Sequence, residues 1–128
     1  MKQYIEVTSH LGRDFSVLSG NDSLILPNLV FGGRGGIACC ANVFPKTLVR
    51  IYESFMAGDF ELAQKTQDNI RILRASFKYG NPNTIVKYAT SLLGYPVGPC
   101  RRPFNGLTEE GKLAVEAAVQ QCREAGLE

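Results

Sequence analysis

Four cysteines and a single histidine are the side chains in this sequence whose types could support metal binding or nucleophilic chemistry. Cys39, Cys40, Cys100 and Cys122 form no Cys-x-x-Cys pair, whereas structural zinc sites usually take their ligands from such pairs. We therefore predict no metal site. Because Cys39 and Cys40 are neighbours in a predicted strand, their side chains are expected on opposite faces. We interpret the cysteines as small buried apolar residues in a reducing cytosol.

Lysine and tyrosine side chains are the other candidates for covalent or proton-transfer chemistry. A nucleophilic lysine needs a pKa depressed by burial or by neighbouring cations, and Lys87 falls in a predicted helix, where we interpret it as structural. His10 has no serine, cysteine or aspartate partner suggested by the sequence, and we expect it to be exposed. Tyr79 and Tyr88 are expected to pack or to form an interface. We therefore assign no catalytic residue to this chain.

Two short motifs resemble anion-binding sequences but fit other roles better. A phosphate-binding glycine loop follows a strand and begins a helix, so that the helix N-terminus faces the anion. The loop of residues 32–36 (GGRGG) has the reverse order, helix and then strand, which predicts a tight return turn. Arg101 and Arg102 form an isolated basic pair in a proline-bounded loop, which is typical of a solvated or salt-bridged loop.

Composition limits the classes of protein to consider. The chain has 128 residues, 45% hydrophobic and 20% charged residues, and a formal net charge of +2, which fits one globular domain. The sequence has no cluster of basic residues that would indicate binding to nucleic acid or to an anionic membrane. No apolar run approaches the ~20 residues that span a bilayer, and residues 1–6 do not resemble a signal peptide. We expect a cytoplasmic protein without nucleic-acid or membrane partners.

The N-terminal half of the pattern predicts a strand–helix–strand unit. Residues 14–19 and 37–41 are short, mostly apolar runs of the kind found in parallel strands that are covered on both faces. The helix between them is expected to be capped by Asp22 or Ser23, with Pro27 in its first turn. Such a unit is long enough for a parallel crossover. Its apolar stripe is expected at Leu26, Leu29 and Val30.

The remaining elements are predicted to be helical. Residues 2–11 precede the first strand as a helix. Four helices follow the second strand, the first starting at Pro45 and the others capped by Asp59, Asn81 and Thr108. A loop over residues 95–106 separates the last two. The faces expected to be buried contain Leu48, Ile51, Tyr52, Phe55 and Met56; Leu62, Ala63, Thr66, Ile70 and Leu73; Ile85, Val86, Ala89, Leu92 and Leu93; and Leu113, Ala117 and Cys122.

A two-stranded parallel sheet is not a stable unit by itself. Each strand has an outer edge with unpaired backbone groups, and one face of the sheet lacks a cover. The pattern therefore predicts that further polypeptide, outside these elements, completes the sheet.

Four ordered motifs resemble those of the dihydrodipicolinate synthase / N-acetylneuraminate lyase family. Residues 15–22 (FSVLSGND) are similar to its seventh barrel strand, and residues 36–45 (GIACCANVFP) to its eighth. Residues 81–87 (NPNTIVK) and residues 102–110, which contain RPF and LTEE, agree as well. The resemblance implies an α/β fold, the C-terminal fragment of a TIM (β/α)8 barrel holding its last two strands. Residues 1–57 would form this partial barrel and residues 58–128 a C-terminal helical domain.

The resemblance also implies a class I aldolase mechanism. In this family a lysine on the sixth strand forms a Schiff base with pyruvate, a tyrosine on the fifth strand relays protons, and a loop near the second strand holds the carboxylate. The resemblance implies that all three lie outside this chain, which alone would be inactive. Ile37 matches the residue whose carbonyl faces pyruvate, and Gly20 matches a glycine at the rim of the site, where barrel active sites lie. No cofactor is implied.

Two departures from the family pattern leave the substrate open. Asn21 and Asp22 stand where two acidic residues are common, and Cys39 and Cys40 replace the usual serine and threonine. The first hypothesis is therefore an enzyme part, with pyruvate or a related keto acid as substrate and a complementary N-terminal half or a homo-oligomer as partner. The alternative is a non-catalytic, self-associating helical module.

Overall fold

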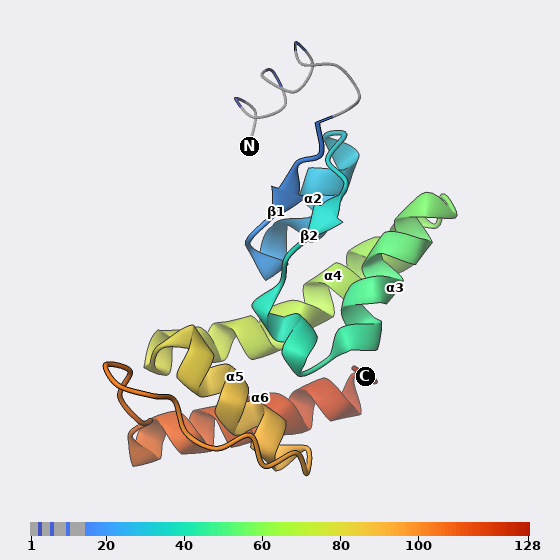
Figure 1. Cartoon of the computed structure of the whole chain (residues 1–128). Coiled ribbons are helices and arrows are strands. Elements are labelled where there is room, and N and C mark those ends of the chain that lie inside the picture. Colours follow the sequence, from blue (N-terminus) through green and yellow to red (C-terminus); the bar gives the residue numbers. More distant parts are fainter. Residues whose placement is uncertain (1–2, 4–5, 7–9, 11–14) are drawn as a thin grey trace.

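The computed structural model of the chain describes residues 3, 6, 10 and 15–128. Figure 1 shows a small strand–helix–strand unit at one end and a set of longer helices at the other. The helix predicted over residues 2–11 lies mostly outside the described residues. The elements are, in chain order and with η for 3-10 helices, β1 (Leu18–Ser19), η1 (Asp22–Leu24), α2 (Ile25–Val30), β2 (Gly35–Gly36), η2 (Cys39–Asn42), α3 (Pro45–Met56), α4 (Phe60–Ala75), η3 (Ser76–Tyr79), α5 (Pro82–Leu92) and α6 (Glu109–Glu124).

The two strands pair in parallel, as the crossover pattern predicted. Leu18 lies opposite Gly35 and Ser19 opposite Gly36. The buried Asn28 side chain of α2 fixes both strands, because its amide donates to the carbonyl oxygens of Val17 at 3.1 Å and Gly35 at 2.9 Å. The glycine loop is the predicted return turn from helix to strand.

The second predicted strand is wrong in its position. The ladder ends at Gly36, and the residues after Ala38 turn into the 3-10 helix η2 instead of continuing as a strand to residue 41. Two interactions explain the turn: the Cys40 N–H donates to the Asp22 carboxylate at 2.7 Å, and the Val43 N–H donates back to the Cys40 carbonyl at 3.0 Å. Cys39 and Cys40 are therefore not strand neighbours on opposite faces of the sheet.

The start of the crossover helix also differs from its prediction. Asn21, not Asp22 or Ser23, is the cap, and its side-chain oxygen accepts from the Ser23 N–H at 3.0 Å at the start of η1. Asp22 instead points inward and is buried. In α2 the buried apolar side chains are Ile25, Leu26 and Leu29, whereas Val30 is exposed.

The caps predicted for the later helices are confirmed. Asp59 accepts from the Leu62 N–H at 3.0 Å, Asn81 from the Asn83 N–H at 2.9 Å, and Thr108 from the Gly111 N–H at 3.1 Å. Each cap satisfies one of the backbone donors that the first turn of a helix leaves without a partner. Pro45 and Pro82 occupy the first helical positions of α3 and α5, where no N–H is needed.

Buried side chains from α2 to α6 form one continuous core, although the helix faces are narrower than predicted. The buried stripe of α3 runs through Leu48, Ile51 and Ser54, against α4. Tyr52 and Met56 lie outside this stripe and are 42% and 63% exposed. Side chains predicted to be buried but found exposed elsewhere are Leu62, Leu92, Leu113 and Ala117.

The last residue ties the end of the chain to the start of α3. The Glu128 N–H donates to the Thr47 hydroxyl at 2.8 Å, and the Thr47 N–H donates to the Glu128 carbonyl at 2.8 Å. Lys46 adds an ion pair to the Glu128 side chain at 3.2 Å. These bonds hold α3 and the segment after α6 together. The predicted division into two domains at residue 57 remains a prediction.

Candidate functional site

The two residues predicted to line a substrate site lie side by side at the carboxyl end of the sheet. Ser19 pairs with Gly36, so Gly20 and Ile37 are the next residues on the two strands, and the Ile37 N–H donates to the Ser19 carbonyl at 2.8 Å. Both are exposed, Ile37 at 73%. A side chain built on Gly20 would meet nothing within 4 Å. The geometry leaves this end of the sheet open, while a role in substrate binding remains a prediction.

Asp22, two residues after Gly20, forms the centre of a buried polar network. Its side chain is only 1% exposed and accepts from the Cys40 N–H at 2.7 Å and from the Arg74 guanidinium at 3.1 Å. Gln67 of α4 completes the network, because its amide donates to the Asp22 carbonyl at 2.8 Å and its oxygen accepts from the Leu26 N–H at 2.9 Å. The network fixes the turn after β1 and the turn after β2 to the same helix.

Sequence reasoning missed this network and assigned Asp22 a local capping role. Its partners Gln67 and Arg74 lie 45 and 52 residues further along the chain, and nothing in the local pattern indicates which helix will approach Asp22. One signal was present in the sequence. Asn21 and Asp22 are adjacent polar residues after the strand, and a helix needs only one cap, so the second was free for another partner.

The cysteines near this network are poorly suited to nucleophilic chemistry. Burial, and secondly the negative charge of Asp22, raise the pKa of the Cys39 thiol. The same two causes, in the same order, raise the pKa of the fully buried Cys40 thiol well above its usual range. A thiol attacks as its thiolate, and both effects disfavour that form. Cys40 and Cys122 are buried, as predicted. Cys39 and Cys100 are only half-buried, which corrects the prediction for those two.

A cavity of about 570 Å³ lies beside the network, between η2, α5 and the loop over residues 95–106. Lys87 on α5 lines the cavity, and its ammonium donates to the Val97 carbonyl of the loop at 3.0 Å. Arg101 and Arg102, expected to be solvated, are exposed and also line it. The lining is completed by side chains that include Cys39, Asn42, Thr90, Cys100 and Phe104. The loop therefore brings the basic pair to the same cavity as Lys87.

The other side chains considered in the sequence analysis form no further candidate site among the described residues. Tyr88 contacts Glu116, and its hydroxyl donates to the carboxylate at 2.5 Å. His10 is exposed. Among the residues that the structure describes, no three histidine, cysteine, aspartate or glutamate side chains gather where they could hold a metal ion. Within the same residues, no helix has the length and apolar character needed to cross a membrane.

Comparison with known proteins gives consistent matches. A model of the dihydrodipicolinate synthetase family matches residues 1–122. The 4-hydroxy-tetrahydrodipicolinate synthase of Methanospirillum hungatei JF-1 is 40% identical over 98 residues, 76% of this chain and 33% of that enzyme. Among solved structures, dihydrodipicolinate synthase DapA-2 of Bacillus anthracis is similar with a TM-score of 0.87 and 29% identity. That similarity covers 93% of this chain and 41% of the other.

A second solved structure is YagE, an Escherichia coli K12 prophage protein of the dihydrodipicolinic acid synthase family in complex with pyruvate. It is similar with a TM-score of 0.86 and 25% identity, over 93% of this chain and 41% of that chain. The similar structures are TIM-barrel enzymes, of which this chain covers only part. The chain spans about a third to two fifths of the lengths of these relatives.

Proposed function

Because the chain belongs to the dihydrodipicolinate synthetase family, we propose that it forms part of a pyruvate-dependent lyase that works through a Schiff base. The observation that carries the proposal is the position of Gly20 and Ile37, adjacent at the carboxyl ends of two parallel strands. Active sites of TIM barrels lie at this end of the strands. The similarity to a family member in complex with pyruvate supports the choice of substrate.

The proposed role of these residues is to form one wall of the keto-acid site. The backbone carbonyl of Ile37 would face bound pyruvate, and Gly20 would leave room at the rim, since no atom lies within 4 Å of the position of a side chain there. A lysine outside the 128 residues would condense with the ketone of pyruvate and release water. We propose no cofactor and a cytoplasmic location, which suits the four unpaired cysteines.

The uncovered surface of the sheet supports a partner that supplies the other strands. β1 and β2 have only each other as neighbours in the described part of the chain. Phe15, Leu18 and Ile37 are 54%, 47% and 73% exposed. An apolar groove of about 340 Å³ runs between the sheet and α3 and is lined by residues that include Leu18 and Tyr52. A strand and helix from the rest of a barrel would cover these side chains and the unpaired backbone.

A chimera tests the proposal directly. The matched 98 residues of the M. hungatei synthase are replaced by the corresponding part of this chain, and the protein is treated with pyruvate and borohydride. We expect a stable adduct on a lysine of the M. hungatei portion and none on this chain alone. An adduct on this chain alone, or a folded chimera that fails to trap pyruvate, would contradict the proposal. Gly20→Ala in the chimera should lower the rate of trapping while leaving its stability unchanged.

The same exposed side chains favour a second candidate, a self-associating module without catalysis. Apolar patches above several hundred Å² are a common cause of association. Under this alternative the isolated chain sediments as a dimer or larger assembly, and Leu18→Ser with Ile37→Ser shifts it toward monomer. A chimera that traps pyruvate would decide for the enzyme part, whereas association without trapping would favour the module.

A further inference from the structure

Three cationic side chains face one cavity, and no acidic side chain lines it. They are Lys87 from α5 and Arg101 and Arg102 from the loop that follows α5. The ion pairs within the described part of the chain are made by other cations, namely Lys46, Arg71, Arg74 and Lys112. The positive charge in this cavity therefore has no carboxylate within 4 Å among the described residues.

The lysine is held in place by the cavity wall. Its ammonium donates one hydrogen bond to the Val97 carbonyl at 3.0 Å, and its side chain is half-buried. An ammonium has three donors, so two remain for a ligand or for water. Because the acceptor belongs to the same loop that carries Arg101 and Arg102, this bond fixes the loop over α5 and keeps the three cations around one space.

The other residues that line the cavity indicate what the uncharged part of a ligand would contact. Val86, Val97 and Phe104 offer apolar contacts, while Asn42, Asn83 and Thr90 offer neutral hydrogen-bonding groups. The volume of about 570 Å³ lies within the range of small-molecule sites. Arginine forks bind carboxylate and phosphate groups with two parallel hydrogen bonds. The combination fits a small organic molecule with one acidic end.

We propose that this cavity binds a small organic anion, whose carboxylate or phosphate group is held by Lys87, Arg101 and Arg102. Neither Gly20 nor Ile37 lines the cavity, so the inference goes beyond the keto-acid wall and does not depend on Schiff-base chemistry. The positive charge attracts the anion. The apolar residues of the lining favour anions that also carry an apolar part.

Two cysteines in the cavity serve as reporters of its charge. Cys39 and Cys100 both line it and are both half-buried, whereas Cys40 and Cys122 are buried. The rates of alkylation by anionic iodoacetate and by neutral iodoacetamide are measured at each thiol by peptide mass spectrometry at low salt. The ratio of the two rates cancels the thiolate fraction, since both reagents attack the same thiolate. A positive cavity raises this ratio.

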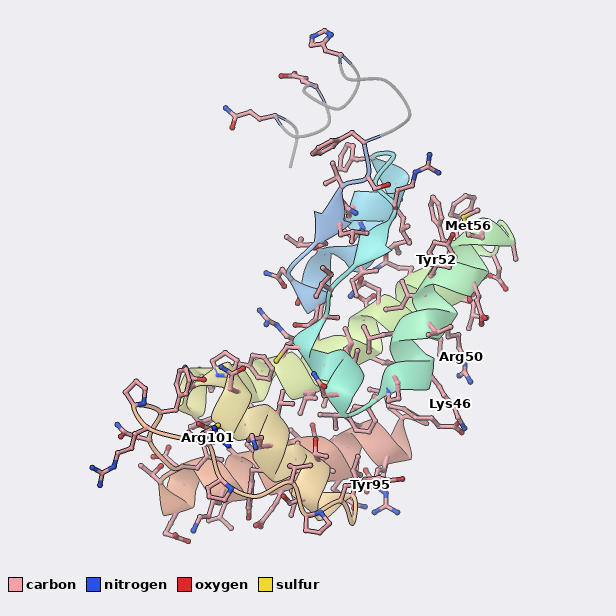
Figure 2. All side chains as sticks on the ribbon, viewed as in Figure 1. Lys46, Arg50, Tyr52, Met56, Tyr95 and Arg101 are labelled. Atoms are coloured by element: carbon pink, nitrogen blue, oxygen red, sulfur yellow. The ribbon has the colours of Figure 1, made fainter. Side chains whose placement is uncertain are left out.

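Charge-removing variants test the assignment. We expect the double variant Arg101→Gln/Arg102→Gln to lower the ratio at Cys39 and Cys100 by at least about threefold. The matched control, Arg50→Gln/Lys65→Gln, removes the same charge from α3 and α4. Arg50 lies on the opposite side of the molecule from Arg101 in Figure 2, and the control should leave the ratio unchanged. Equal changes in both double variants, or none in either, would overturn the proposed positive cavity.

Binding is tested with inorganic phosphate and succinate as separate probes. Each is expected to protect Cys39 and Cys100 from iodoacetamide in the wild-type chain and to lose this protection in Arg101→Gln/Arg102→Gln. Protection by phosphate alone assigns a phosphate-bearing ligand, and protection by succinate alone a carboxylate. Equal protection by sodium chloride at the same ionic strength, or no protection by either probe, would overturn the binding site.

Discussion

The Asp22 carboxylate lies 3.1 Å from the Arg74 guanidinium, and the two side chains are 1% and 29% exposed. The same carboxylate accepts the Cys40 N–H at 2.7 Å. One buried anion therefore holds the turn after β1, the turn after β2 and the helix α4 together. Gly20 and Ile37 lie where β1 and β2 lead into these two turns. The Asp22–Arg74 ion pair therefore positions the proposed keto-acid wall relative to α4.

The unequal burial of this pair predicts unequal costs when either partner is removed. Arg74→Met leaves a buried carboxylate without its cation and should lower the free energy of unfolding by about 3 to 5 kcal/mol. Asp22→Asn keeps an acceptor for the Cys40 N–H and leaves an arginine that reaches water, so its cost should be smaller, about 1.5 to 3 kcal/mol. Urea unfolding of both variants measures the difference.

A surface pair on the same helix provides the control. Arg71 lies 2.9 Å from Asp68, with both side chains more than two fifths exposed, so Arg71→Met should cost only about 0 to 1 kcal/mol. Asp22→Asn combined with Arg74→Met should cost less than the sum of the single changes, because they share one interaction. Additive costs would show that the two side chains are not coupled.

Gln67 is expected to be a second essential tie between the strand unit and α4. The Leu26 N–H belongs to the first turn of α2 and has no partner within that helix, so the Gln67 side chain is its acceptor. Gln67→Leu leaves this donor buried and unpaired and removes one donor to the Asp22 carbonyl, which should cost about 1 to 3 kcal/mol. Gln64→Leu, an exposed change on the same helix, should cost under about 0.5 kcal/mol in the same urea experiment. Equal stability of the two variants would refute the role of Gln67.

Two glycines near the sheet should differ in how strongly substitution by alanine changes the stability of the chain. A side chain at Gly36 would lie 2.9 Å from Ile25 Cγ1 and 3.2 Å from the Ser19 carbonyl, so Gly36→Ala should destabilise the chain by about 1 to 3 kcal/mol. Gly20→Ala meets no atom and should change the free energy of unfolding by less than about 1 kcal/mol. Thermal unfolding of both variants distinguishes the two outcomes. Comparable losses would show that the turn after β1 is more crowded than the geometry indicates.

The buried thiols predict a loss of stability in alkali. Burial raises the pKa of Cys122 to about 11, opposed by the Leu73 backbone hydrogen bond, and it raises the pKa of Cys40 still further. Above about pH 9 the unfolded thiols release protons that the folded chain retains. The free energy of unfolding should therefore fall as pH rises from 9 to 11, by about 1.4 kcal/mol per pH unit for each thiol.

Unfolding in urea with a reducing agent, at pH 8, 9, 10 and 11, measures this slope. Cys40→Ala combined with Cys122→Ala should be less stable at pH 8, because it leaves cavities in the core, yet should show a flatter decline between pH 9 and 11. A decline of unchanged slope in the double variant would assign the alkaline effect to other groups.

Local signals in the sequence were sufficient to predict where the last three helices begin. Asp59, Asn81 and Thr108 were predicted as caps and act as caps, because a cap depends only on a side chain and the backbone two or three residues later. The parallel pairing of the strands was predicted for a similar reason, since a strand–helix–strand unit of this length has few other ways to close. The family was predicted from ordered motifs, and the family match confirms it.

The parts that were wrong or missed depend on contacts between distant segments. Residues 37–41 were predicted to form a strand, but an apolar run forms a strand only beside a partner strand, and the pairing with β1 ends at Gly36. The Cys40 N–H instead donates to the Asp22 carboxylate, within a 3-10 helix. Tyr52 and Leu113 read as core, but the direction from which a neighbouring helix approaches decides which side of an apolar stripe is buried.

The sequence by itself determined the family, a parallel strand pair followed by helices, and the caps of the last three helices. Only the tertiary structure decided that Asp22 is a buried hub and that Arg101 and Arg102 share a cavity with Lys87. The physical reason is that the burial of a side chain and the charges around it depend on residues far away in sequence. Asp22 and Arg74 are 52 residues apart, and Lys87 and Arg101 are 14 residues apart. Such distances in sequence leave no local periodic pattern.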